Sequence, residues 1–124
     1  MLKPLVFVAA VLAAGTAFAA EPAGPAPKAS NGVYVTAKGM TLYTFDKDTA
    51  GKSVCNAKCA ENWPPALASD GAKPMGAWTL VTRDDGLKQW ALNGKPVYAF
   101  VKDTKPGDKV GDGFLNGAWH IARP

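Results

Sequence analysis

The sequence predicts an all-β fold in which two pseudo-symmetric, three-stranded antiparallel repeats form a small barrel or sandwich. Three observations lead to this prediction. A seven-residue segment occurs in two similar copies, YTFDKDT from Tyr43 and YAFVKDT from Tyr98. Short runs of alternating apolar and polar residues are separated by glycine turns, which is typical of strands. No stretch after the N-terminal apolar segment shows a sustained helical period.

The N-terminal residues 1–19 have the anatomy of a secretory signal peptide. Lys3 precedes an apolar run, and Ala17 and Ala19 satisfy the small-x-small rule, so cleavage is expected after Ala19. The apolar run is too short to span a bilayer as a permanent helix. We therefore expect a periplasmic or secreted protein without a permanent membrane anchor.

Residues 20–31 are rich in proline and alanine and lack large apolar side chains, which predicts a flexible leader. A single β domain is expected to follow over residues 32–124. The formal charge is +4 for the whole chain, and +3 once Lys3 is removed. The lysines are scattered among acidic residues and form no basic stripe, so a nucleic-acid partner is not expected.

Six strands are predicted from alternating runs that end at turn residues. Lys38-Gly39 and Asn93-Gly94 are the dipeptides expected in tight hairpin turns. The predicted strands are Val33–Ala37, Thr41–Asp46, Trp78–Arg83, Lys88–Leu92, Pro96–Val101 and Trp119–Arg123.

The repeat is defined by an alignment at an offset of 55 residues. Residues 39–49 match residues 94–104 at six of eleven positions, against roughly one in seventeen expected by chance. Both copies are followed by Gly-Ala-Trp, which aligns Trp78 with Trp119. Repeat one then covers about residues 32–83, with a cysteine-containing insertion, and repeat two about residues 88–124. Two such units can bury, against each other, the apolar face that a single unit would leave exposed to solvent.

The doubled motif contributes both aromatic and acidic side chains. The two aromatics of each copy lie two residues apart in a strand and so face one core between the repeats. We expect the carboxylates of Asp48 and Asp103 to accept the backbone N–H two residues on, in an Asx-turn. Alternatively, each tyrosine hydroxyl and aspartate lines a polar pocket in its own half. The aromatic residues are Tyr43, Phe45, Tyr98 and Phe100.

The two copies of this motif fit the pattern Y-x-[FWY]-x-x-D, and they adjoin CNAKCAENWPP and a closing Trp-His. The chain resembles the bacterial family of secreted repeats described as predicted lipoproteins with a Yx(FWY)xxD motif. The resemblance covers roughly residues 31–124 and implies an exported repeat of unknown biochemical function. Many relatives are lipoproteins, but this chain has no cysteine in its signal region, so a lipid anchor is not carried over.

Cys55 and Cys59 are the only cysteines and have the spacing C-x-x-x-C. On a helical turn their Cα atoms lie about 6 Å apart, so a disulfide is the expected state in an oxidising compartment. Trp63, followed by two prolines, is expected to pack as a plug over one end of the barrel. The alternative is a copper site, because two thiolates and His120 are ligands that suit copper.

The sequence shows none of the motifs of conventional catalysis, such as a nucleophile elbow, H-E-x-x-H or a phosphate-binding glycine loop. We therefore predict a non-catalytic binding or interaction module of the cell envelope, without a cofactor. Its partner would be an envelope protein or a small ligand. The alternative is a periplasmic redox or copper-handling protein that uses the cysteine pair.

Overall fold

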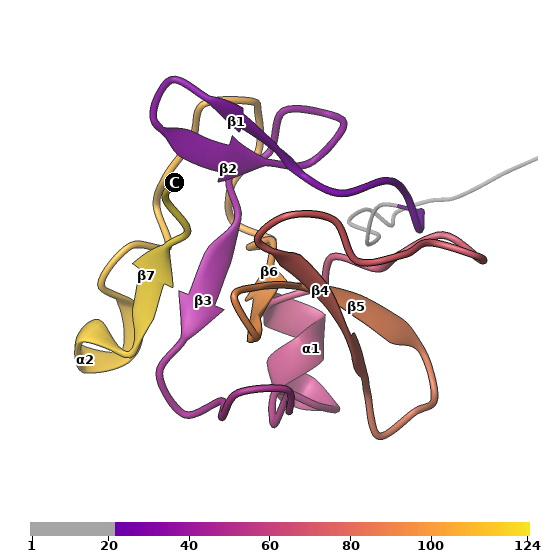
Figure 1. The fold of residues 1–124 in the computed structure, drawn as a ribbon. Coiled ribbons are helices and arrows are strands. Elements are labelled where there is room, and N and C mark those ends of the chain that lie inside the picture. Colours follow the sequence, from indigo (N-terminus) through magenta and orange to yellow (C-terminus); the bar gives the residue numbers. More distant parts are fainter. Residues whose placement is uncertain (1–21) are drawn as a thin grey trace, which may run out of the picture.

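The computed structural model describes residues 22–124, and the predicted signal peptide lies outside the described residues (Figure 1). Within this part of the chain, no helix has the length and apolar character needed to cross a bilayer. The helices and strands are β1 (Lys28–Ser30), β2 (Val33–Val35), β3 (Tyr43–Phe45), α1 (Lys58–Asn62), β4 (Trp78–Thr82), β5 (Lys88–Leu92), β6 (Lys95–Tyr98), α2 (Phe114–Gly117) and β7 (Trp119–Ile121).

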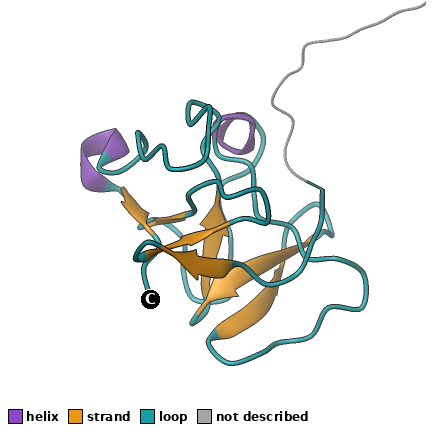
Figure 2. Cartoon of the chain, turned by 90° about the horizontal axis from the view of Figure 1, so that it is seen from above, coloured by secondary structure: helices purple, strands orange, loops and turns teal. Residues whose placement is uncertain are grey.

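The strands form two antiparallel sheets. β1 and β2 make a two-stranded sheet, and the other five strands are arranged in the order β4-β5-β6-β3-β7. The sheets are sandwich-like and do not close into a barrel, and the two short helices lie outside the strands (Figure 2). The prediction of an all-β fold is confirmed, and each of the six predicted strands overlaps an observed one.

β1 lies in the segment that was predicted to be a flexible leader. It pairs with β2 through the register Ala29↔Tyr34, and upstream the N–H of Gly24 donates to the carbonyl of Leu67 at 3.0 Å. Trp90 Nε1 also donates to the Gly24 carbonyl, at 3.0 Å. The folded part therefore begins before residue 32. The sequence gives no sign of this, because the three β1 side chains are exposed and the pairing is made by backbone groups.

The two repeats are related by a pseudo-twofold axis that passes between β3 and β6 of the five-stranded sheet. β3 and β6 are neighbours (Figure 1). Their register places Tyr43 directly opposite Tyr98, its equivalent in the other repeat. Because the two strands are antiparallel, the residues that follow each motif tyrosine pass the axis and lie beside residues of the other repeat. The motif side chains are thereby brought to meet side chains from the opposite half.

The structure corrects the alignment of the tryptophans. β7 runs beside β3, and the N–H of Asp46 donates to the carbonyl of Ala118, just before Trp119. In the other half, the N–H of Val101 donates to the carbonyl of Asn62, just before Trp63. The equivalent of Trp119 is therefore Trp63 and not Trp78.

Trp63 is consequently a core residue rather than a plug over one end, and it is 5% exposed. The two prolines after it do not prevent pairing, because Pro64 acts as an acceptor beside the end of β6 and Pro65 forms a bridge with Tyr98. The carbonyl of Pro64 accepts the N–H of Ala99 at 2.8 Å. Trp78 belongs to a second core cluster, where its ring lies 4.9 Å from Tyr34 and 6.5 Å from Trp90 between centroids.

Candidate functional site

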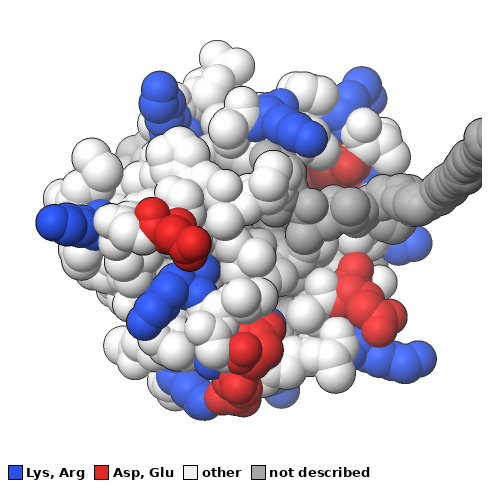
Figure 3. Space-filling view, turned by 90° about the vertical axis from the view of Figure 1, so that its right-hand side faces the viewer, with Lys and Arg blue, Asp and Glu red and all other residues white. Residues whose placement is uncertain are grey.

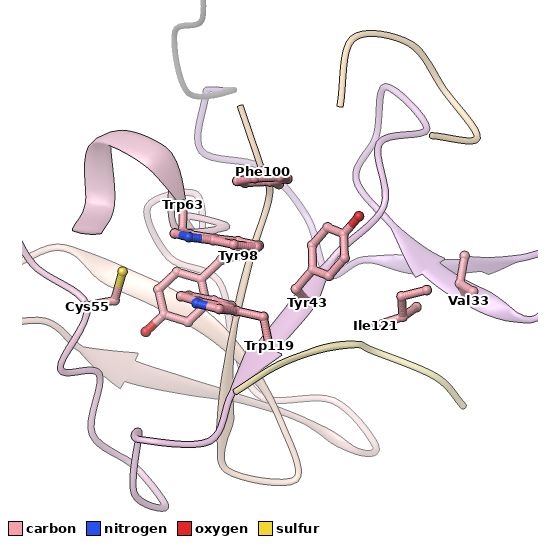
Figure 4. Close-up of a cluster of buried hydrophobic side chains, with 8 residues drawn as sticks. All are labelled: Val33, Tyr43, Cys55, Trp63, Tyr98, Phe100, Trp119 and Ile121. Carbon is pink, nitrogen blue, oxygen red and sulfur yellow. The ribbon is translucent and has the colours of Figure 1, made fainter. Parts of the chain in front are cut away.

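Four aromatic rings form a continuous stack at the pseudo-twofold axis, in the order Phe45, Trp119, Trp63 and Phe100. The successive centroid distances are 4.2, 3.7 and 3.9 Å, with interplanar angles of 11°, 3° and 15°. Figure 4 shows the parallel rings of Trp63 and Trp119 at the centre of this cluster. Each motif phenylalanine therefore stacks on the tryptophan of the other repeat.

The two motif tyrosines pack edge-on against the tryptophan rings of the stack. Tyr43 meets Trp63 edge-on at 5.4 Å and 81°, and Tyr98 meets Trp119 at 5.2 Å and 85°. These are the edge-to-face geometries that aromatic pairs prefer. Both tyrosines are fully buried. The expectation that the motif aromatics share one core between the repeats agrees with this arrangement.

Each motif tyrosine donates its hydroxyl to the motif aspartate of the other repeat. Tyr43 Oη lies 2.7 Å from Asp103 Oδ2, and Tyr98 Oη lies 2.5 Å from Asp48 Oδ2. The second oxygen of each aspartate accepts a backbone N–H much farther along the chain than an Asx-turn requires. The donors are Val54 for Asp48, at 2.8 Å, and Val110 for Asp103, at 2.9 Å.

The Asx-turn expectation for the motif aspartates is therefore wrong. The alternative, a tyrosine and an aspartate lining a pocket within one half, is wrong in its pairing. A tyrosine hydroxyl and an aspartate carboxylate do come together, but they belong to different repeats. They form a hydrogen bond with each other across the axis. The motif thus links the repeats by two reciprocal, charge-assisted hydrogen bonds, of which Tyr43–Asp103 is buried and Tyr98–Asp48 is partly buried.

Burial shifts the pKa of all four groups in these pairs. It raises the pKa of Tyr43 and Tyr98 well above the usual tyrosine range, and the adjacent carboxylate raises each further. Burial also raises the pKa of Asp48 and Asp103, while the hydrogen bond from the partner tyrosine lowers it. The phenols therefore stay protonated as donors at neutral pH, which suits a structural role.

The environments of the two tyrosines differ. Tyr98 Oη also lies 2.6 Å from Ser53 Oγ, which accepts a hydrogen bond from the buried guanidinium of Arg83 at 3.1 Å. The same guanidinium donates to Gln89 Oε1 at 2.8 Å. Tyr43 Oη instead accepts the N–H of Gly111 at 3.2 Å. Sequence reasoning missed Arg83, because an arginine before Asp-Asp-Gly is indistinguishable from an ordinary surface turn residue.

Cys55 and Cys59 are joined in a disulfide with a Cα–Cα distance of 5.1 Å, as expected from their spacing. Cys55 is buried beside the aromatic cluster and Cys59 lies in α1. His120 is on β7, where its Nε2 lies 2.9 Å from Asp46 Oδ2. Among residues 22–124, no three histidine, cysteine or acidic side chains are grouped to hold a metal ion, so His120 is not brought to the cysteines.

A groove of about 410 Å³ lies away from the motif, beside the segment that joins the repeats. Its lining includes Leu67 and Ala72, together with Leu80 and Lys88 of the β4–β5 hairpin. None of the motif residues contributes to this groove. It is therefore separate from the tyrosine–aspartate pairs.

The fold and the reciprocal motif define a two-repeat β module. A sequence model of a family described as a secreted repeat of unknown function matches residues 28–67 and again residues 79–123. The chain belongs to this family, in agreement with the resemblance found from the motif. No curated protein and no solved structure matches the chain. The first match ends at residue 67, so the cysteine segment and Trp63 are inside the repeat, and Trp78 lies between the two matches.

Proposed function

We propose that the chain is an exported, non-catalytic binding module of the cell envelope, and that the loop between β6 and β7 is its contact surface for a partner protein. Membership of a family of secreted repeats supports export. The motif side chains support a non-catalytic role, because the tyrosine and aspartate groups are engaged with one another or with the backbone.

The observation that carries the proposal is the conformation of Leu115. This residue adopts φ 57° and ψ 54°, and its side chain is 58% exposed. The left-handed region costs a non-glycine residue about 1–2 kcal/mol, and a leucine gains no local hydrogen bond in return. Strained backbone that presents an exposed apolar side chain is characteristic of sites whose contacts come from another molecule.

Neighbouring residues extend this apolar surface. Phe114, also in α2, is 45% exposed, and Val110 in the same loop is 54% exposed. The inner side of Phe114 rests on the aromatic stack, with its centroid 5.0 Å from that of Phe100. The loop is thus anchored to the rigid centre of the domain, which suits a binding surface.

The charge distribution favours a protein partner over a nucleic acid. Figure 3 shows basic and acidic side chains interspersed over the face that it draws, without a large area of one sign. In the loop itself, the apolar residues stand beside the exposed Lys109 and Asp112, which fits a protein interface in which an apolar centre is surrounded by polar groups.

Site-specific photo-crosslinking in cells that export the protein tests the proposal. A photoreactive residue at Leu115 is expected to capture one envelope protein, whereas the same residue at Leu87, exposed to 49% in another loop, is not. With the captured protein purified, Leu115→Asn should weaken binding at least tenfold. Equal labelling from both positions, or unchanged affinity of the variant, would contradict the proposal.

A further inference from the structure

We propose that the Cys55–Cys59 disulfide is a thiol–disulfide exchange site, which a dithiol protein of the envelope reduces and re-forms while the β domain stays folded. This inference is independent of the partner-binding loop. Three features of the cysteine loop support it: backbone strain between the cysteines, unequal burial of the two cysteine residues, and a buried guanidinium that contacts the backbone carbonyl of one of them.

The strain is at Ala57, which has φ 53° and ψ −121°. These angles belong to the first central position of a type II′ turn, where glycine is the usual residue because a Cβ is disfavoured. Three residues separate the cysteines, so the disulfide closes a small ring with Ala57 at its centre. Breaking the S–S bond frees Ala57 to relax, and the strain therefore favours the reduced form.

The two cysteine residues differ in their exposure to solvent. Cys55 is 0% exposed, whereas Cys59, in the first turn of α1, is partly exposed. A thiolate attacks the sulfur that it can reach, in line with the bond that breaks. The incoming thiolate is therefore directed to Cys59 Sγ, and Cys55 becomes the leaving group.

A buried guanidinium contacts the backbone of the leaving cysteine. The Arg83 side chain is 2% exposed, and its Nη2 donates to the carbonyl oxygen of Cys55 at 2.9 Å. A neighbouring cation stabilises a thiolate, and a stabilised thiolate leaves faster. The acidic groups near this turn are exposed and already engaged: Asp85 lies 3.5 Å from Arg83 Nε, and Asp84 pairs with Lys52.

The exchange is balanced in two steps. One thiolate of the dithiol attacks Cys59 Sγ, which breaks the Cys55–Cys59 bond, forms a mixed disulfide and releases Cys55 as a thiolate. The second thiol of the partner then attacks the partner sulfur that is bonded to Cys59. This attack forms the partner's own disulfide and releases Cys59. The domain gains two electrons and two protons, and the partner loses them as it becomes a disulfide. Oxidation runs along the same path in reverse.

The test is a redox titration of the exported full-length domain in buffers of reduced and oxidised dithiothreitol at pH 7. Thiols are trapped by alkylation and counted by mass, and near-ultraviolet circular dichroism reports whether the aromatic core stays packed. Wild-type protein should be reduced with its near-ultraviolet spectrum intact. Ala57→Gly should require a reduced-to-oxidised ratio about tenfold higher for half-reduction, equivalent to ~30 mV.

Ala60→Gly is the matched control, since Ala60 lies in α1 just outside the disulfide ring. It should leave the half-reduction ratio within about twofold of wild type. A dithiol reductase whose resolving cysteine is replaced by serine should be trapped on Cys59. Reduction only together with loss of the near-ultraviolet spectrum, equal shifts for the two glycine variants, or trapping on Cys55 would each overturn the proposal.

Discussion

Replacing Gly111 with alanine tests how tightly the aromatic stack is packed. Gly111 is buried and does not have a positive φ, so any effect of a Cβ comes from its neighbours and not from the backbone. A Cβ there would lie 2.8 Å from Cη2 and 2.9 Å from Cζ3 of Trp63, and 3.0 Å from Cδ2 of Phe100. Contacts this short require the rings to move.

The rings have little room to move, because Trp63 is held between Trp119 at 3.7 Å and Phe100 at 3.9 Å. Overpacking of this kind costs roughly 1–3 kcal/mol of the free energy of unfolding. For a domain of about this size, that corresponds to a melting temperature lower by roughly 5–20 °C. Urea denaturation followed by tryptophan fluorescence measures the change directly.

Gly24→Ala is the matched control, because the nearest atom to its added Cβ would be the Pro22 carbonyl oxygen at 3.8 Å. A glycine-to-alanine change at a permissive position stabilises by about 0.4–1 kcal/mol, through the unfolded chain. In the Gly111→Ala background, Trp63→Phe should recover part of the lost stability, since it removes the atoms in contact. A Gly111→Ala variant as stable as the Gly24→Ala control would refute the close packing of the stack.

Three further predictions follow from the strained and buried groups. Leu115→Asn should raise the free energy of unfolding by about 0.5–1 kcal/mol, because asparagine tolerates the left-handed region, and thermal denaturation measures this. The raised pKa of Tyr43 and Tyr98 means that the folded state holds phenol protons that the unfolded state releases above pH 10. Stability should therefore fall as pH rises beyond 10, by up to about 1.4 kcal/mol per pH unit for each phenol. A Tyr43→Phe variant with an unchanged alkaline slope would contradict this assignment. Removing the disulfide with Cys55→Ala and Cys59→Ala should cost less than the ~2 kcal/mol expected from chain entropy, because the strain in the loop is released. A loss well above that value in urea denaturation would argue against strain.

Much of the fold could be predicted because its signals are local. Alternating apolar residues and glycine turns indicated six strands, and the doubled Tyr-x-Phe-x-x-Asp identified the repeat. The spacing of Cys55 and Cys59 indicated their disulfide. Each of these features depends on residues that are close together in the chain, where periodicity and turn chemistry apply.

The rest depends on contacts between distant residues. The motif tyrosines find their acceptors in the other repeat, 60 residues away for Tyr43 and 50 for Tyr98, and no local pattern indicates which aspartate is used. The shared Gly-Ala-Trp suggested that Trp78 is the equivalent of Trp119. The true equivalent, Trp63, follows its motif aspartate at nearly the same spacing as Trp119 but lies within a dissimilar loop sequence.

A double-mutant cycle tests the central claim, that the motif links the two repeats by exchanged tyrosine–aspartate pairs. Tyr98→Phe is combined with Asp48→Asn in one cycle and with Asp103→Asn in the other, and urea denaturation gives each free energy of unfolding. A partly buried hydrogen bond to a charged group predicts a coupling of about 1.5–3 kcal/mol between Tyr98 and Asp48. Tyr98 and Asp103, within one motif, should be additive within about 0.5 kcal/mol. Coupling within the motif, and none across the repeats, would contradict the account.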